Sequence, residues 1–368
     1  MASRKFNILM FGARRAGKSS VLASMIDSFA NLSSTTASNI TIKAINGTDL
    51  IMDKKKANLK AVFEKPVEDE LKWALDENMT QVTDTYTFSI SSPGSEVYEL
   101  CFKDIPGEWM IDREDWIVKE LTQSQIILVA IDTPHLLEEG GFYSNSMNIM
   151  EQMAALISKI EDEKSVPRML LFVPIKCEKY YYENRMDQIT EAIMKEYSIL
   201  LEYLGNEKNK KLFTVAITPI LTMGGVVFRD FQRDSEGYVE VWEPKDTDNP
   251  SLLYRPKAAY YKRYAPAPTF KPQYCEQPVL YLLNFVSKQV TGLQMQAKKK
   301  GKNKVGKFVK RVLLALISIQ YPFVLFFLIK DIIEDTAFVE SAKKTATDLK
   351  TQDDGYVILQ DPMGISNK

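Results

Sequence analysis

The sequence predicts a three-layer α/β protein, in which a mostly parallel sheet lies between helices and carries one antiparallel hairpin at its edge, with a helical C-terminal extension. Two observations support this prediction. Short apolar runs alternate with segments of helical periodicity, which is typical of a parallel sheet covered on both faces. A turn between two alternating segments, 85–91 and 97–105, predicts the hairpin.

The elements follow one another in a regular order along the first 220 or so of the 368 residues. The expected strands are 5–11, 39–45, 85–91, 97–105, 126–132, 168–175 and 212–218. The expected helices are 19–32, a charged stretch from about 49 to 77, and two further segments around 145–163 and 187–204. Because the later strands are apolar runs separated by helices, they are expected to form a parallel sheet that is covered on both faces.

The pattern changes after Gly224. A second hairpin is expected from 224–231 and 237–242, followed by a proline- and tyrosine-rich loop at about 244–278 and a helix at 278–289. We therefore expect one domain at 1–292, a basic and apolar helical extension at 293–335, and a mobile polar tail at 336–368 with one short strand-like piece. Within the domain, 39–82 forms an insert, and the second hairpin and its loop occupy about 224–277.

Composition excludes several classes of function. The net charge is −1, so no overall field attracts nucleic acid, and none is expected as a partner. Three distant cysteines and a single histidine, His135, supply neither a disulfide framework nor a metal cluster. No signal peptide is visible, and His135 is read as an ordinary loop residue. The chain is expected in the cytoplasm.

The segment FGARRAGKSS, residues 11–20, satisfies the pattern G-x-x-x-x-G-K-[ST] between a strand and a helix. Glycines let backbone N–H groups surround phosphates, and the helix N-terminus adds the positive end of its dipole. Lys18 would reach the β- and γ-phosphates, and Ser19 would ligate Mg²⁺. The expected nucleotide-binding residues of this loop are Gly12, Ala13, Arg14, Arg15, Ala16, Gly17, Lys18, Ser19 and Ser20. A P-loop NTPase fold follows from this context.

A second motif supports the first. The hairpin's second strand ends in DIPGE, which supplies Asp104 and, three residues later, Gly107. A carboxylate at the end of a strand beside the phosphate loop can hold Mg²⁺ through water, and the glycine N–H can contact the γ-phosphate and begin a mobile switch.

The three segments GARRAGKS, DIPGE and IKCEKY together resemble a Ras-like GTPase of the TRAFAC class. ITPILTMGGVVF and CEQPVLYLLNFV are most similar to the double-GTPase families of bacterial conflict systems, and the resemblance covers about 5–290. It implies hydrolysis of GTP to GDP and phosphate with Mg²⁺, and a switch that controls an unidentified protein partner or effector in bacterial defence.

The resemblance also assigns roles to further residues. Lys176 would pack on the base and Glu178 would pair with guanine in place of the usual aspartate, while Ile175 departs from the family's asparagine. The switch threonine, a further metal ligand, would be Thr83, with Thr80 as the second choice. Because Ile175 weakens the motif, an ATPase with the same phosphate chemistry stays open.

Hydrolysis in such a protein would use Glu108, at the position of the family's water-orienting glutamine. A carboxylate can orient water but adds repulsion near the γ-phosphate. Arg15 lies where guanylate-binding proteins and atlastins carry an arginine that neutralises charge in cis, so we expect Arg15→Ala to lower turnover and spare affinity. Arg14 has no assigned role. A nucleotide-binding scaffold or membrane adaptor with little hydrolysis is the alternative that Glu108 leaves open.

The segment 298–329 combines a basic cluster with an apolar run. Lysines and one arginine occupy 298–311, and 312–329 reads VLLALISIQYPFVLFFLI. This arrangement is typical of membrane contact with the basic side in the cytoplasm. Gln320 and Pro322 interrupt the run, however, so packing on the domain or on a partner is an equal alternative, and a peripheral membrane location stays open.

Overall fold

The computed structural model describes residues 4–13, 16–35, 41–61, 63, 71–74, 83–91, 98–160, 166–247, 253–264, 269–300, 352–353 and 355–366. Arg14, Arg15, Thr80 and most of the basic and apolar segment 298–329 lie outside these residues.

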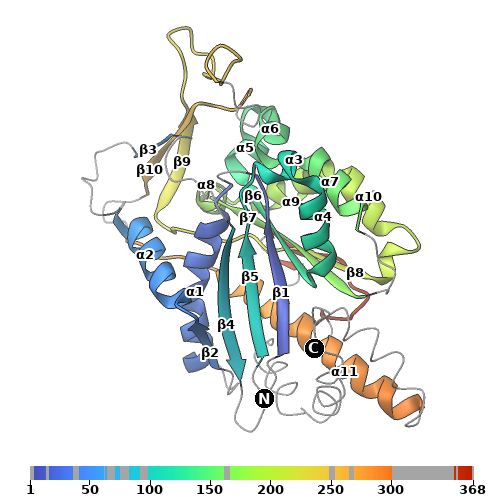
Figure 1. The fold of residues 1–368 in the computed structure, drawn as a ribbon. Coiled ribbons are helices and arrows are strands. Elements are labelled where there is room, and N and C mark those ends of the chain that lie inside the picture. The colour runs from blue at the N-terminus through green and yellow to red at the C-terminus, as the bar shows by residue number, and fades with distance from the viewer. Residues whose placement is uncertain are drawn as a thin grey trace.

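A nine-stranded sheet forms the middle layer of the described part of the chain, in the order β11-β12-β8-β7-β6-β1-β5-β4-β2 (Figure 1). The five central strands run parallel, and β4, β2, β12 and β11 are antiparallel to their neighbours. The strands are β1 Arg4–Phe11, β2 Thr41–Ile45, β4 Asp84–Ser91, β5 Tyr98–Asp104, β6 Ile126–Asp132, β7 Arg168–Ile175, β8 Phe213–Ile217, β11 Gln352–Asp353 and β12 Tyr356–Gln360. The predicted α/β fold with its antiparallel hairpin is confirmed.

Helices cover both faces of this sheet (Figure 1). The helices are α1 Lys18–Thr35, α2 Thr48–Ala61, α3 Trp109–Asp112, α4 Glu114–Gln123, α5 Thr133–Leu137, α6 Ser144–Asn148, α7 Met150–Ser158, α8 Glu178–Tyr182, α9 Met186–Glu196, α10 Ser198–Gly205 and α11 Gln277–Lys300, with short 3-10 turns η2 Glu138–Gly141 and η3 Asn209–Lys211. One core cluster joins α1, α2 and α11 to the sheet, and the other joins α4, α7, α9 and α10. Side chains of β6 alternate between the clusters, since neighbouring residues of a strand face opposite sides.

The C-terminal residues close one edge of the sheet. β12 pairs with β8, the Tyr356 hydroxyl donates to the Pro219 carbonyl (2.7 Å), and Asn284 of α11 donates to the Ile365 carbonyl. The predicted strand-like piece is present, but the expectation of a mobile tail is wrong for 355–366. The error arose because the partner of β12 lies far back in the sequence.

A second, three-stranded sheet follows the order β3-β10-β9, from Leu71–Ala74, Ala258–Arg263 and Val226–Phe231. It corrects two predictions. The charged helix ends at Ala61 rather than near 77. A helix through this region is opposed by Pro66, which disfavours helical backbone at the residue before it, and by residues 71–74, which pair with β10 as a strand. The partner of 224–231 is β10, inside the predicted loop, while 237–242 makes isolated bridges at Val239 and Val241.

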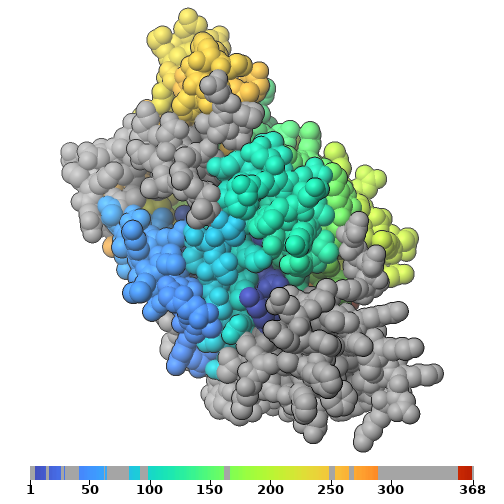
Figure 2. Space-filling model, in the orientation of Figure 1, coloured from blue at the N-terminus to red at the C-terminus, as the bar shows by residue number. Residues whose placement is uncertain are grey.

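The described segments that join β9 to β10 project from the body of the domain, as Figure 2 shows in yellow and orange. At the other end, α11 continues through the expected boundary at residue 292 to Lys300. Among the described helices, none combines the length and the apolar character needed to span a bilayer.

Candidate functional site

The loop between β1 and α1 requires glycine at both of its ends. Gly12 has a φ of +145° and Gly17 a φ of +97°, conformations that residues with a Cβ rarely adopt. A Cβ at Gly12 would also lie only 3.0 Å from the carbonyl oxygen of Ala130 in β6, and one at Gly17 would collide with the Ile175 side chain at the end of β7. The loop therefore lies on the carboxyl ends of β6 and β7, where open α/β sheets bind ligands.

Lys18 is a buried cation at this loop, with 7% of its surface exposed. Its ammonium group donates to the carbonyl oxygens of Gly12 (2.9 Å) and Ala13 (3.0 Å). Burial lowers the pKa of Lys18, the carboxylates of Asp104 and Glu108 raise it, and the nearby charge of Arg255 lowers it further. Within the described residues Lys18 is held by main-chain carbonyls, which a cation can exchange for a phosphate oxygen, since a hydrogen bond between charged groups is stronger.

Oxygen atoms of Ser19 and Asp104 lie beside Lys18. Asp104, at the end of β5, is fully buried and accepts a hydrogen bond from the hydroxyl of Ser19. Its other oxygen, Oδ1, is buried, and so is the hydroxyl of Thr83; within the described residues neither atom has a hydrogen-bond partner. Thr83 directly precedes Asp84, which pairs with Asp104 across β4 and β5. Buried carboxylate and hydroxyl oxygens without partners suit a hard cation such as Mg²⁺.

Asp84 is a residue that sequence reasoning missed. It lies opposite Asp104 in the register of β4 and β5 and accepts a hydrogen bond from the Tyr86 hydroxyl (2.9 Å). Burial, that hydrogen bond and the charge of Asp104 together raise the pKa of Tyr86. The predicted hairpin could have revealed this pair, because its register places the two carboxylates on one face.

Gly107 and Glu108 connect β5 to the short helix α3. Gly107 is buried, and Glu108 is the N-cap residue that precedes Trp109, where its charge acts to raise the pKa of Lys18. Glu108 is thus close enough to influence the lysine of the phosphate loop, and its role in orienting water stays a prediction. In the described residues no group of three or more His, Cys, Asp or Glu side chains could hold a metal on its own.

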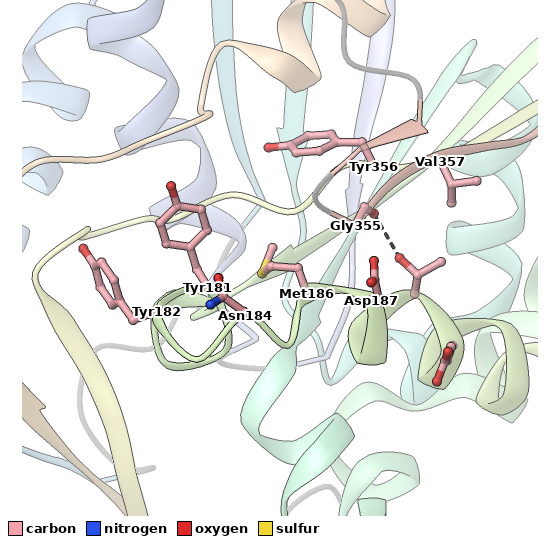
Figure 3. A pocket seen from close by; sticks show the side chains of 10 residues that line it. Tyr181, Tyr182, Asn184, Met186, Asp187, Gly355, Tyr356 and Val357 are labelled. Carbon is pink, nitrogen blue, oxygen red and sulfur yellow. Dashed lines mark hydrogen bonds between the residues drawn. The ribbon is translucent and has the colours of Figure 1, made fainter.

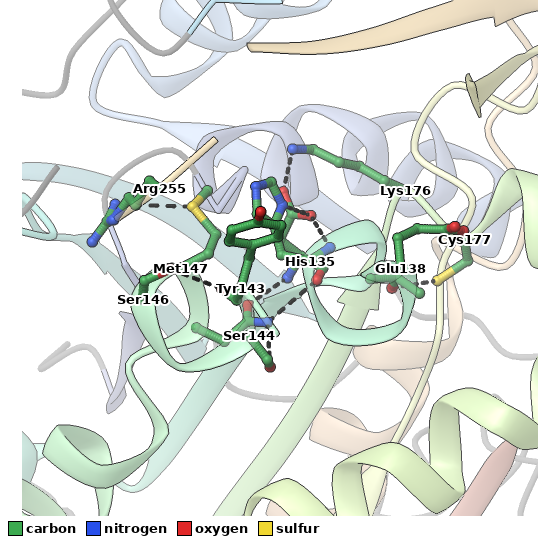
Figure 4. A network of polar contacts seen from close by, with 12 residues as sticks. His135, Glu138, Tyr143, Ser144, Ser146, Met147, Lys176, Cys177 and Arg255 are labelled. Carbon is green, nitrogen blue, oxygen red and sulfur yellow. Dashed lines mark hydrogen bonds and ion pairs between the residues drawn. The ribbon is translucent and has the colours of Figure 1, made fainter. Parts of the chain in front are cut away.

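Lys176 follows β7 in a left-handed conformation, with a φ of +57°. Its ammonium group forms an ion pair with Asp132, which ends the neighbouring strand β6 and also contacts His135 Nδ1 (2.7 Å; Figure 4). Burial alone would raise the pKa of Asp132, but His135 and Lys176 outweigh it and hold that pKa below its usual range. Lys176 is therefore engaged by Asp132, and His135 belongs to this buried network rather than to a loop surface.

Glu178 holds a loop. It is 2% exposed, and its Oε1 accepts hydrogen bonds from the amides of Met223 (2.9 Å) and Gly224 (3.1 Å). Burial raises the pKa of Glu178, while the two amides and Lys176 lower it. One oxygen of the carboxylate expected to read guanine thus fixes the segment after β8, so a base would have to be read by the other oxygen.

Glu178→Ala is expected to lower the free energy of unfolding by about 1–3 kcal/mol, because two buried N–H groups lose their acceptor. Glu178→Gln retains an oxygen acceptor and is expected to recover most of this loss. Urea titration followed by circular dichroism measures both variants, with the exposed Glu191→Ala as the control. Equal midpoints for Glu178→Ala and wild type would show that the loop does not depend on this carboxylate.

A cavity of about 870 Å³ lies apart from the phosphate loop, between α8, α9 and the C-terminal residues (Figure 3). Its lining includes Tyr181, Tyr182, Asp187, Thr190, Gly355 and Tyr356. Thr190 donates to the Gly355 carbonyl (3.0 Å), and Tyr182 donates to the Gly224 carbonyl (2.6 Å). The cavity therefore adjoins the segment at Met223 and Gly224 that Glu178 also contacts, through its lining residue Tyr182.

No protein-family model matches the chain, and no curated protein matches its sequence. Solved structures that match include the Ski7 GTPase-like domain of S. cerevisiae bound to GDP and inorganic phosphate, at 14% identity over 68% of this chain and 48% of that one, with a TM-score of 0.38. The same domain bound to GTP matches at 15% identity over 66% and 47%, with a TM-score of 0.36. Sup35 complexed with GDP matches at 13% identity over 69% and 46%, with a TM-score of 0.30. The chain spans about half the length of these structures. TM-scores this low do not support conclusions about its site.

Proposed function

We propose that this chain binds GTP together with Mg²⁺ and hydrolyses it to GDP and phosphate. The observation that carries the proposal is a buried Lys18, held by loop carbonyls, beside the Ser19–Asp104 pair, in which Asp104 has a second buried oxygen without a hydrogen-bond partner within the described residues. A cation next to a set of oxygen ligands at a glycine-rich loop is what a magnesium triphosphate requires.

The phosphate loop and the residues beside it would each contact a different part of the magnesium triphosphate. Main-chain amides of the loop from Gly12 to Ser20 would surround the phosphates, and Lys18 would donate to the β- and γ-phosphate oxygens. Ser19, Thr83 and Asp104 would hold the Mg²⁺ ion or its waters, and the ion would neutralise charge on the phosphates. The amide of Gly107 would meet the γ-phosphate.

Glu108 would accept a hydrogen bond from the attacking water and orient it toward the γ-phosphate. Its carboxylate is close enough to affect Lys18, so its charge also opposes the binding of a third phosphate. Slow intrinsic turnover is the expected consequence. Arg15, outside the described residues, is retained as a proposed source of positive charge in this step.

Guanine recognition is assigned to Lys176 and Glu178. Glu178 has a second carboxylate oxygen beyond the one bound to the Met223 and Gly224 amides, and that oxygen would accept from the N–H groups of guanine. Adenine has no matching pair of donors on that edge, so GTP is favoured over ATP.

The segments around Thr83 and Gly107 would respond to the γ-phosphate, as in switch proteins. We therefore propose a nucleotide-dependent switch for a protein partner or effector. The resemblance to double-GTPase families of bacterial conflict systems supports the further proposal that this partner acts in defence.

Calorimetry should show that purified protein binds GDP at least about tenfold more tightly than ADP, a difference of about 1.4 kcal/mol. Phosphate release from GTP should depend on Mg²⁺ and stop in EDTA, and the nucleotide retained on purification should be GDP or GTP. Tighter binding of ADP would replace the guanine assignment with an ATPase. Nucleotide binding with no phosphate release would point to a scaffold.

A further inference from the structure

The segment that follows β8, residues 218–224, connects the phosphate-binding side of the domain with the residue expected to read the base. On one side, the Ser24 hydroxyl of α1 donates to the Thr222 carbonyl (3.0 Å), and α1 begins at Lys18 of the phosphate loop. On the other side, two amides of the segment donate to Glu178 (2.9 and 3.1 Å). The position of segment 218–224 therefore decides where the carboxylate of Glu178 lies.

Two residues of the C-terminal part of the chain contact this segment at Pro219. The Tyr356 side chain is buried, and its hydroxyl donates to the Pro219 carbonyl (2.7 Å). Gly355 has a φ of +81°, and a Cβ there would lie 3.3 Å from Cγ of Pro219 and 3.1 Å from the carbonyl oxygen of Met186. Proline has no N–H, so the carbonyl is the main-chain group through which a hydrogen bond can hold Pro219. Gly355 thus permits the close approach that brings the Tyr356 hydroxyl to this carbonyl.

Gly355 and Tyr356 are themselves held from two directions. The Thr190 hydroxyl of α9 donates to the Gly355 carbonyl (3.0 Å; dashed line in Figure 3). The strand that Tyr356 begins, β12, pairs with the end of β8. Because β8 leads directly into segment 218–224, the C-terminal residues brace this segment at its start.

We propose that Tyr356 is a positioning residue for guanine recognition. By holding Pro219, its hydroxyl keeps segment 218–224, and with it the carboxylate of Glu178, in the orientation that reads the base. The inference rests on the proposed function, in which the second oxygen of Glu178 accepts from the N–H groups of guanine. Adenine offers no matching pair of donors on that edge, so affinity for an adenine nucleotide should not depend on Tyr356.

The carboxylate of Glu178 is sensitive to small movements of segment 218–224. A hydrogen bond weakens steeply as its angle falls below about 120°, so the oxygen that reads the base must point in the right direction. The other oxygen is bonded to two amides of the segment, and a shift of these amides would turn the whole carboxylate. The phosphates would be bound by the loop from Gly12 to Ser20, whose shape depends on its own glycines.

Tyr356→Phe removes the hydroxyl and keeps the ring, so it tests the contact with Pro219. Calorimetry is expected to show an affinity for GDP about tenfold lower than that of wild type, as for the loss of one buried hydrogen bond, and an unchanged affinity for ADP. In phosphate release, KM for GTP should rise by a similar factor while kcat stays constant, because uniform binding is lost. The matched control is Tyr203→Phe, which removes a hydroxyl that donates to a different main-chain carbonyl, that of Ser158 (3.3 Å).

Thr190→Val and Thr190→Ser form a second pair of variants. The valine variant loses the donor to the Gly355 carbonyl and should lower the preference for GDP over ADP, while the serine variant keeps a hydroxyl and should retain that preference. Thermal unfolding monitors the fold of each variant. If Tyr356→Phe does not fold, the Thr190 pair decides, and an unchanged preference in Thr190→Val would then overturn the inference.

Equal losses of GDP and ADP affinity in Tyr356→Phe would assign the hydroxyl to general stability and would also overturn the inference. If wild type itself does not prefer GDP to ADP, the proposed reading of guanine fails, and the role of Tyr356 fails with it. If wild type prefers GDP and a folded Tyr356→Phe protein does so equally, the role of Tyr356 alone fails.

Discussion

Lys18→Ala is expected to abolish detectable GTP turnover and to weaken triphosphate binding by about 10²–10⁴-fold. Hydrogen bonds to charged groups contribute about 1.5–3 kcal/mol each, and Lys18 would make two of them, to the β- and γ-phosphates. The loop loses the two hydrogen bonds from Lys18 to the carbonyls of Gly12 and Ala13, but the backbone conformations of Gly12 and Gly17 and the helix that follows still shape it.

Equilibrium binding of a fluorescent GTP analogue and phosphate release would measure this loss. Lys5→Ala is the matched control, because Lys5 lies at the start of the same β1 strand with its side chain exposed. Thermal unfolding without nucleotide should show little difference between the variant and wild type. Normal binding by a folded Lys18→Ala protein would remove the phosphate loop from the proposed site.

Asp104→Asn is expected to reduce turnover at millimolar Mg²⁺ by about 10³-fold, in line with the several kcal/mol that a metal ion contributes to phosphoryl transfer. The amide oxygen of asparagine can still accept the Ser19 hydroxyl, so the contact between α1 and β5 survives. The lost charge instead weakens the attraction for the ion, which should appear as a higher Mg²⁺ concentration for half-maximal activity.

A titration of phosphate release against Mg²⁺ tests this expectation, with Asp112→Asn as the control because Asp112 is exposed on α3. A variant that recovers full activity at high Mg²⁺ would support ion binding by Asp104. An unchanged Mg²⁺ dependence would assign Asp104 to structure rather than to the metal.

Local patterns predicted the main sheet well. Strands β6, β7 and β8 are buried along their whole length, so each reads as an apolar run that needs no knowledge of its neighbours. The phosphate loop was equally visible, because Gly12, Gly17 and Lys18 lie within seven residues of each other. Asp104 followed from the end of a recognisable hairpin.

The features that the sequence did not predict depend on contacts between segments that lie far apart along the chain. β3 is short and becomes a strand through β10, more than 180 residues away, and β10 pairs with β9 across the whole projecting segment. The role of Glu178 as the acceptor for Met223 and Gly224 likewise appears only when β7 and β8 are neighbours.

The closure of β8 by β12 has a consequence for biosynthesis. Tyr356, which bonds to Pro219, is synthesised 137 residues after it. At about 5–20 residues per second, the edge of β8 and the loop after it wait about 7–27 s for their partner. During that interval an apolar strand presents an unpaired edge to other nascent chains, a known route to aggregation. Expression at low temperature or with chaperones should therefore raise the soluble yield of wild type more than that of a version in which β12 is translated directly after β8.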